Sequence, residues 1–190
     1  PSNVPPRILA ALARPTIGHL DPRFVAMMDE VKALLQQAFR TTNRLTIPIS
    51  GPGSAGMEAC FVNLVEPGDT VIVCRNGVFG GRMRENVVRI GARCVLVEDP
   101  YGQPVSLDKV EAALRANPGA KALAFVHAET STGVLNPVRE LAAVARAHDA
   151  LVLVDAVTSF GGHPLEVGAW GIDACYSCTQ KCLGAPSGLS

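Results

Sequence analysis

The stretch "ALAFVHAETSTGVLNPVRELAAVARAHDALVLVDA", residues 122–156, decides the fold. It begins with a continuous apolar run at 122–127, passes the turn residues Asn136 and Pro137 into an apolar pattern with helical spacing, and ends in a second apolar run at 151–156. Short apolar runs without period-two alternation, separated by a helical pattern, are typical of parallel strands that are buried on both faces. The stretch therefore predicts a strand–helix–strand unit.

The same alternation continues along the rest of the chain. Further strands are predicted at 70–74, 94–98 and 174–178, and helices at 22–40, 80–90 and 107–114. A short extended run at 45–50 leads into a glycine-rich turn, "GPGSAG" (51–56), and a helix to about Val65. We expect an α/β fold with a mostly parallel sheet and helices on both faces. Residues 21–190 are predicted to form one domain, preceded by an N-terminal arm at 1–20.

Composition excludes several classes of function. Lysine plus arginine equals aspartate plus glutamate, 17 against 17, so no basic surface indicates a nucleic-acid partner. Of the 190 residues, 48% are hydrophobic, but no apolar run reaches the roughly 18 residues that a membrane span needs. No signal segment opens the chain. We expect a soluble, cytoplasmic protein without a membrane partner.

Six cysteines raise the question of a metal site or a disulfide framework. The last three have the spacing C-x-x-C-x-x-x-C, but no second cluster and no nearby histidine complete a zinc site. A long, apolar chain has little need of disulfides. We therefore expect no metal, and small buried hydrophobic roles for Cys60, Cys74, Cys94, Cys175, Cys178 and Cys182.

Residues just after the strands carry the functional interpretation, because ligands of parallel sheets bind beyond the carboxyl ends of the strands. Gly53, Ser54 and Ala55 lie where an extended run turns into a helix. Free backbone N–H groups and the helix dipole make such a turn able to bind an anion. A plain tight turn is the alternative, since the residues form neither a dinucleotide fingerprint nor a Walker loop.

Two charged residues complete the pattern. Asp155 ends a strand and could merely cap the next turn, or could be a buried carboxylate that pairs with a protonated ring nitrogen. Lys181 lies just after the last strand, and it could be a surface lysine or an amine with a lowered pKa that forms a Schiff base. Together with the turn at 53–55, they indicate a site for pyridoxal 5′-phosphate.

Motifs spread over the whole chain resemble those of one enzyme family. They are "SGPGSAGMEACFVNLVEPGDTVIV" (50–73), "NGVFGGR" (76–82), "HAETSTGVLNP" (127–137), "LVLVDAVTSFGG" (151–162) and "GIDACYSCTQKCLGAP" (171–186). In order and spacing they resemble the class V aminotransferases, pyridoxal phosphate enzymes of fold type I. Within these, the chain is most similar to the alanine–glyoxylate and serine–pyruvate aminotransferases.

The resemblance implies a role for each matching residue. Lys181 would hold the cofactor as an aldimine and shuttle a proton, and Asp155 would keep the pyridinium nitrogen protonated. The other implied cofactor contacts are Gly53, Ser54, Ala55 and Gln180 at the phosphate, Phe79 and Val157 on the two faces of the ring, and Thr130 near the 3′-oxygen. We expect His127 and Glu129 only to neighbour these contacts, with His127 as a hydrogen-bonded structural histidine.

The resemblance also implies the reaction. A small amino acid, alanine or serine, would give its amino group to a 2-oxo acid, glyoxylate or pyruvate, in a homodimer of the full-length enzyme. Relatives carry a C-terminal small domain and a substrate-binding arginine beyond the matching region, so the chain resembles an N-terminal fragment. Alternatives are another pyridoxal phosphate activity (2-aminoethylphosphonate transamination, cysteine desulfuration or β-elimination), a non-catalytic nucleotide-binding module, or an assembly fragment.

Overall fold

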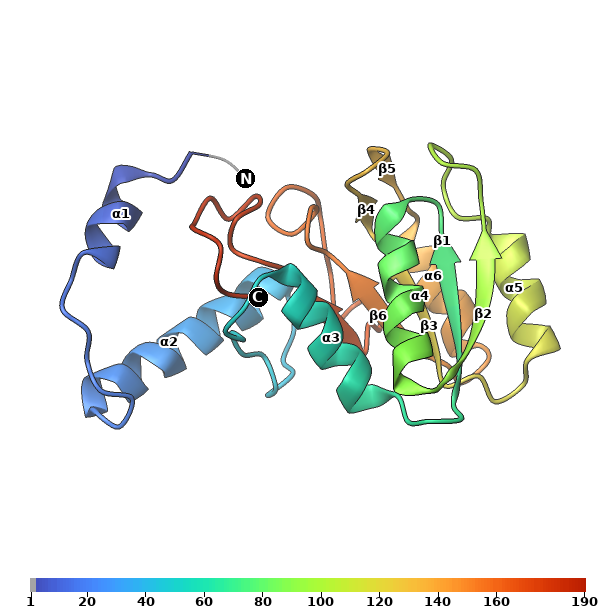
Figure 1. The fold of residues 1–190 in the computed structure, drawn as a ribbon, viewed down its shortest axis with the longest axis horizontal. Helices are drawn as coiled ribbons and strands as arrows, with labels where there is room; N and C mark the ends of the chain where they lie inside the picture. The colour runs from blue at the N-terminus through green and yellow to red at the C-terminus, as the bar shows by residue number, and fades with distance from the viewer. Residues whose placement is uncertain (1–2) are drawn as a thin grey trace.

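The computed structural model describes residues 3–190, which form a five-stranded sheet between helices, with two further helices extending to one side (Figure 1). In chain order the elements are α1 (Pro6–Leu12), α2 (Pro22–Phe39), α3 (Gly53–Leu64), β1 (Thr70–Arg75), α4 (Val78–Ile90), β2 (Arg93–Glu98), α5 (Leu107–Ala116), β3 (Ala122–Val126), β4 (Ala128–Glu129), β5 (Val134–Leu135), α6 (Val138–Arg146), β6 (Leu151–Asp155) and β7 (Ala174–Tyr176).

The sheet has the strand order β2-β1-β3-β6-β7, and every pair in it is parallel. The central strand β3 is buried along its whole length, which explains why its sequence is apolar without alternation. The predicted fold class, a mostly parallel sheet with helices on both faces, is confirmed.

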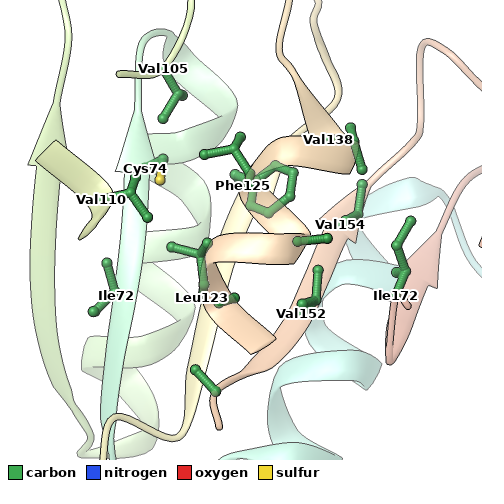
Figure 2. Close-up of a cluster of buried hydrophobic side chains, with 14 of the residues drawn as sticks. Ile72, Cys74, Val105, Val110, Leu123, Phe125, Val138, Val152, Val154 and Ile172 are labelled. Carbon is green, nitrogen blue, oxygen red and sulfur yellow. The ribbon is translucent and has the colours of Figure 1, made fainter. Parts of the chain in front are cut away.

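Two hydrophobic cores cover the two faces of the sheet. On one face, side chains of α5 and α6 pack against alternate strand residues, among them Ile72, Leu123, Phe125 and Val152 (Figure 2). On the other face, α3 and α4 pack against the strand residues that alternate with this first set, such as Val73 and Leu153. Successive strand residues therefore serve opposite cores.

The order of the strands reverses between β1 and β3. Strand β1 leads through α4 to β2 on one side, while β3, β6 and β7 lie on the other side. At such a reversal, the loops beyond the carboxyl ends of the strands diverge toward opposite faces and leave room for a ligand. The loops after β1, β3, β6 and β7 meet at this edge of the sheet.

The N-terminal part joins the rest of the chain at the end of α2. The rings of Phe39 and Phe160 stack with centroids 3.9 Å apart, and Arg40 forms an ion pair with Glu166. Asp21 caps α2 as its sequence predicts, accepting a hydrogen bond from the backbone N–H of Arg23.

Several boundaries differ from the prediction. Helix α1 lies within the arm at 1–20, and the hairpin β4–β5 was not expected. The run at 45–50 forms no strand; only Ser50 makes a bridge, with Leu189. Helix α4 begins earlier than 80, at Val78, because side-chain acceptors from β4 and the adjoining turn bind its first N–H groups. Strand β7 ends at Tyr176, not at 178, because it pairs only with the end of β6.

The expectation that all six cysteines are buried is wrong for Cys182. It is exposed because it lies in the turn after β7, outside either core.

Between residues 3 and 190, no group of three or more His, Cys, Asp and Glu side chains is placed to hold a metal ion. None of the helices described for this chain combines the length and the apolar character needed to cross a membrane.

Candidate functional site

Asp155 is the buried carboxylate of the site. It lies at the end of β6 and is 2% exposed. One oxygen, Oδ1, accepts a hydrogen bond from the backbone N–H of Val157 at 2.8 Å, and the other, Oδ2, accepts one from the hydroxyl of Tyr176 at 2.9 Å. Burial raises the pKa of Asp155 to about 6, although both hydrogen bonds act in the opposite direction.

The parallel register brings Tyr176 to Asp155. The two residues are Cα partners on β6 and β7, so their side chains lie side by side on the same face of the sheet. Leu153, two residues before Asp155, belongs to the core under α3 and α4. The carboxylate therefore points to the face that α3 and α4 cover.

Lys181 lies in the turn after β7 and is partly buried. Strand β7 pairs in parallel with the end of β6, so the turn that contains Lys181 and the Asp155 carboxylate follow neighbouring strands at the same edge of the sheet. Within residues 3–190, Lys181 forms no ion pair with a carboxylate. The amine therefore shares this edge with the carboxylate without forming an ion pair with it.

The start of α3 packs against residues that follow β6 and β7. A Cβ atom on Gly53 would lie 2.9 Å from Val157 Cγ2 and 3.3 Å from both Cβ and Sγ of Cys178, so only glycine lets the helix approach this closely. The N-cap residue Pro52 provides no side-chain acceptor, and the first turn contains no acidic residue. The helix end is thus uncapped and carries the positive end of its dipole.

The other residues expected at the phosphate surround this helix end. Ser54 is exposed and Ala55 is partly buried, both in the first turn of α3. Gln180 immediately precedes Lys181, and its Oε1 atom is buried without a hydrogen-bond partner among the described residues. The uncapped helix end can donate N–H groups to an anion, whereas the unpartnered Oε1 atom of Gln180 is an acceptor that needs a donor.

Phe79, Val157 and Thr130 come from three different loops. Phe79, in the first turn of α4, and Val157, after β6, are both partly buried and pack on the core under α3 and α4. The guanidinium of Arg82 lies 4.8 Å from the centroid of the Phe79 ring. Thr130 is exposed, and its hydroxyl forms a hydrogen bond with that of Thr158.

Sequence reasoning missed Tyr176 and misjudged His127. Tyr176 could have been found from the register of β6 and β7, and Glu129, which is fully buried, contacts the backbone of Phe79 directly. His127 is buried as expected, but it is not satisfied, because its Nδ1 atom has no partner in the described part of the chain. Burial lowers the pKa of His127 to about 4, so the ring is neutral at pH 7.

Fold and site together define a parallel-sheet α/β protein with a lysine and a buried carboxylate beside a helix N-terminus. The chain belongs to the aminotransferase class-V family, whose model matches residues 7–190. The family resemblance of the motifs is thereby confirmed.

Individual relatives are similar over the whole chain. The alanine–glyoxylate aminotransferase of Oryctolagus cuniculus is 43% identical over 191 residues, which cover 100% of this chain and 48% of that protein. The (S)-ureidoglycine–glyoxylate transaminase of Bacillus subtilis is 38% identical and is covered to 45%. The crystal structure of an alanine–glyoxylate aminotransferase from Nostoc sp. superposes with a TM-score of 0.96 at 44% identity, covering 100% of this chain and 50% of that one. The chain thus spans about half the length of these relatives.

Proposed function

We propose that the full-length protein is a pyridoxal phosphate-dependent aminotransferase that moves an amino group from a small amino acid, alanine or serine, to a 2-oxo acid such as glyoxylate or pyruvate. One observation carries the proposal: a buried carboxylate, Asp155, ends β6, an amine, Lys181, follows the neighbouring parallel strand β7, and the first residue of α3, Gly53, packs on Val157 and Cys178 just after these two strands. Membership of the class V family and the names of the relatives support it.

The residues present fit this cofactor. The uncapped start of α3, with glycine at its first position, offers N–H donors to a phosphate. Asp155 is a carboxylate acceptor for a protonated ring nitrogen. When bound, pyridoxal phosphate acts as the electron sink for the carbanion that loss of the substrate Cα proton creates.

Each side chain then has a definite task. Lys181 would hold the cofactor through its amine and would serve as the base for the substrate Cα proton. Asp155, held by Val157 and Tyr176, would pair with the ring nitrogen and keep it protonated. Phe79 and Val157 would cover the ring and exclude water. The hydroxyl of Thr130 would bind the 3′-oxygen.

The names of the relatives narrow the acceptor. Two of them, the alanine–glyoxylate and the (S)-ureidoglycine–glyoxylate enzymes, share glyoxylate although their amino donors differ. Glyoxylate is therefore the acceptor that we propose first, with alanine as donor. (S)-ureidoglycine is the second candidate for the donor, because it stands in the name of a relative that is 38% identical to this chain.

A product assay tests the function. The full-length enzyme, supplied with pyridoxal phosphate, alanine and glyoxylate, is expected to form glycine and pyruvate in equal amounts, and Lys181→Ala is expected to form neither while keeping its fold. Serine and (S)-ureidoglycine serve as competing donors. Release of ammonia or sulfide without a 2-oxo acid acceptor would instead favour a lyase or a desulfurase.

We also propose that the full-length enzyme is a homodimer. Helices α1 and α2 extend away from the sheet and contain no buried residue (Figure 1). Their apolar side chains include Leu12, which is 64% exposed, and Leu34, which is 55% exposed, and Leu20 between the helices is 81% exposed. A second copy that covers this surface would remove it from water. Sedimentation of the full-length protein tests this proposal.

A further inference from the structure

Glu129 is a buried carboxylate to which the proposed reaction gives no task. It is 0% exposed, yet no lysine or arginine in residues 3–190 pairs with it. A charge buried without a partner is strongly destabilising. The carboxylate must therefore be stabilised by hydrogen-bond donors, and these donors show what it holds.

All of its donors lie at the start of α4 or in the turn after β4. Oε2 accepts a hydrogen bond from the backbone N–H of Phe79 at 3.1 Å. Oε1 accepts one from the backbone N–H of Ser131 at 3.1 Å and one from its hydroxyl at 2.7 Å. The Ser131 oxygen in turn accepts the backbone N–H of Val78 at 3.0 Å. Glu129 and Ser131 thus bind the first two N–H groups of the helix.

This arrangement replaces an ordinary helix cap. The N-cap residue of α4 is Gly77, which has no side chain to accept a hydrogen bond. A Cβ atom there would lie 2.2 Å from Cγ and 2.3 Å from Cδ of Glu129, so glycine is required for the carboxylate to reach the helix. An anion at a helix N-terminus also interacts favourably with the dipole. The cap comes from the loop after β3 because β1 and β3 are neighbours in the sheet.

We propose that Glu129 is a positioning residue of the site, because its carboxylate fixes the first turn of α4 and thereby the place where the Phe79 ring meets the cofactor. This rests on the proposed function, in which Phe79 covers one face of the cofactor ring. Glu129 accepts a hydrogen bond from the backbone N–H of Phe79, and the side chain of this same Phe79 is the one proposed to cover the cofactor ring. Glu129 follows β3 and Asp155 ends β6, and these two strands are parallel neighbours in the sheet.

The test is a double-mutant cycle in the full-length apoenzyme, with pyridoxamine 5′-phosphate as the probe because it has no aldehyde to bond with Lys181. Phe79→Ala is expected to weaken binding by roughly 2- to 10-fold, the usual worth of an aromatic contact. Glu129→Ala is expected to weaken it by a similar factor. If Glu129 acts through Phe79, then adding Glu129→Ala to Phe79→Ala weakens binding by less than about twofold further.

Two further variants keep the test decisive. Ser131→Ala removes part of the cap at an exposed position and should weaken binding in the same coupled manner, even if Glu129→Ala folds poorly. Glu140→Ala removes an exposed glutamate from α6, away from the start of α4, and should not change binding of the probe to the apoenzyme. Full additivity of the Glu129 and Phe79 effects, or of the Ser131 and Phe79 effects, overturns the positioning role. A wild-type enzyme that binds neither pyridoxamine phosphate nor pyridoxal phosphate instead overturns the proposed function.

Discussion

Tyr176 and Asp155 are register partners on adjacent parallel strands, and the tyrosine hydroxyl donates a hydrogen bond to Asp155 Oδ2 at 2.9 Å. Both side chains are buried. The bond holds the carboxylate in one orientation and partly offsets the cost of burying its charge. The site therefore depends on how the sheet pairs as well as on the residues that contact the ligand.

Tyr176→Phe is expected to raise the pKa of Asp155 further, because the tyrosine bond favours the ionised form. It should also lower the free energy of unfolding of the apoenzyme by about 1–3 kcal/mol at pH 8, where an ionised carboxylate loses a buried donor. Urea denaturation measures this loss. Tyr101→Phe, at an exposed tyrosine, is the control and should have no effect.

Asp155→Asn is expected to change how the stability of the apoenzyme depends on pH. The folded pKa of Asp155, about 6, lies above the ordinary value of 3.8, so between these values the folded state binds a proton that the unfolded state lacks. Asp155 thus makes the free energy of unfolding decrease as the pH rises from about 4 to about 6. In Asp155→Asn this contribution to the decrease should be absent.

A second buried group acts in the opposite direction over nearly the same range. The pKa of His127 is lowered from 6.5 to about 4, so its contribution to stability rises with pH. The effect of Asp155 is therefore read as the difference between wild-type and Asp155→Asn unfolding curves at pH 4 and pH 7. Equal slopes in the two proteins would contradict the raised pKa.

Gly53→Ala is expected to displace the start of α3, because the new methyl group would meet Val157 and Cys178. We expect a loss of about 1–3 kcal/mol in stability and weaker binding of inorganic phosphate and pyridoxal phosphate. Gly81→Ala in α4 is the matched control, because the nearest atom to its Cβ is 3.9 Å away. That variant should be as stable as the wild type or more so, and wild-type behaviour of Gly53→Ala would contradict the close approach.

The sequence alone predicted the parts of the fold that depend on local pattern. The apolar runs at 122–127 and 151–156 identified β3 and β6 because strands buried on both faces cannot alternate. Asp155, Lys181 and the start of α3 were proposed as one site because the ends of parallel strands share one edge of the sheet. These predictions needed no knowledge of which strands pair.

The features that the sequence could not predict depend on pairing and on contacts across loops. Tyr176 meets Asp155 only because β7 pairs with β6 in one register, and Glu129 caps α4 only because β3 lies beside β1. Helix α1 has no N-cap side chain and no buried residue, so it left no amphipathic signal to detect. The exposed Cys182 was misjudged because residue type alone favours burial.

The proposed function depends most directly on Lys181, the amine that we propose to hold the cofactor. The full-length protein is mixed with pyridoxal phosphate, reduced with borohydride and digested, and the peptide that carries the cofactor is identified by mass spectrometry. We predict that the label lies on Lys181 and that Lys181→Ala incorporates none. A label on another lysine, or no label on a protein that binds the cofactor, would contradict the assignment.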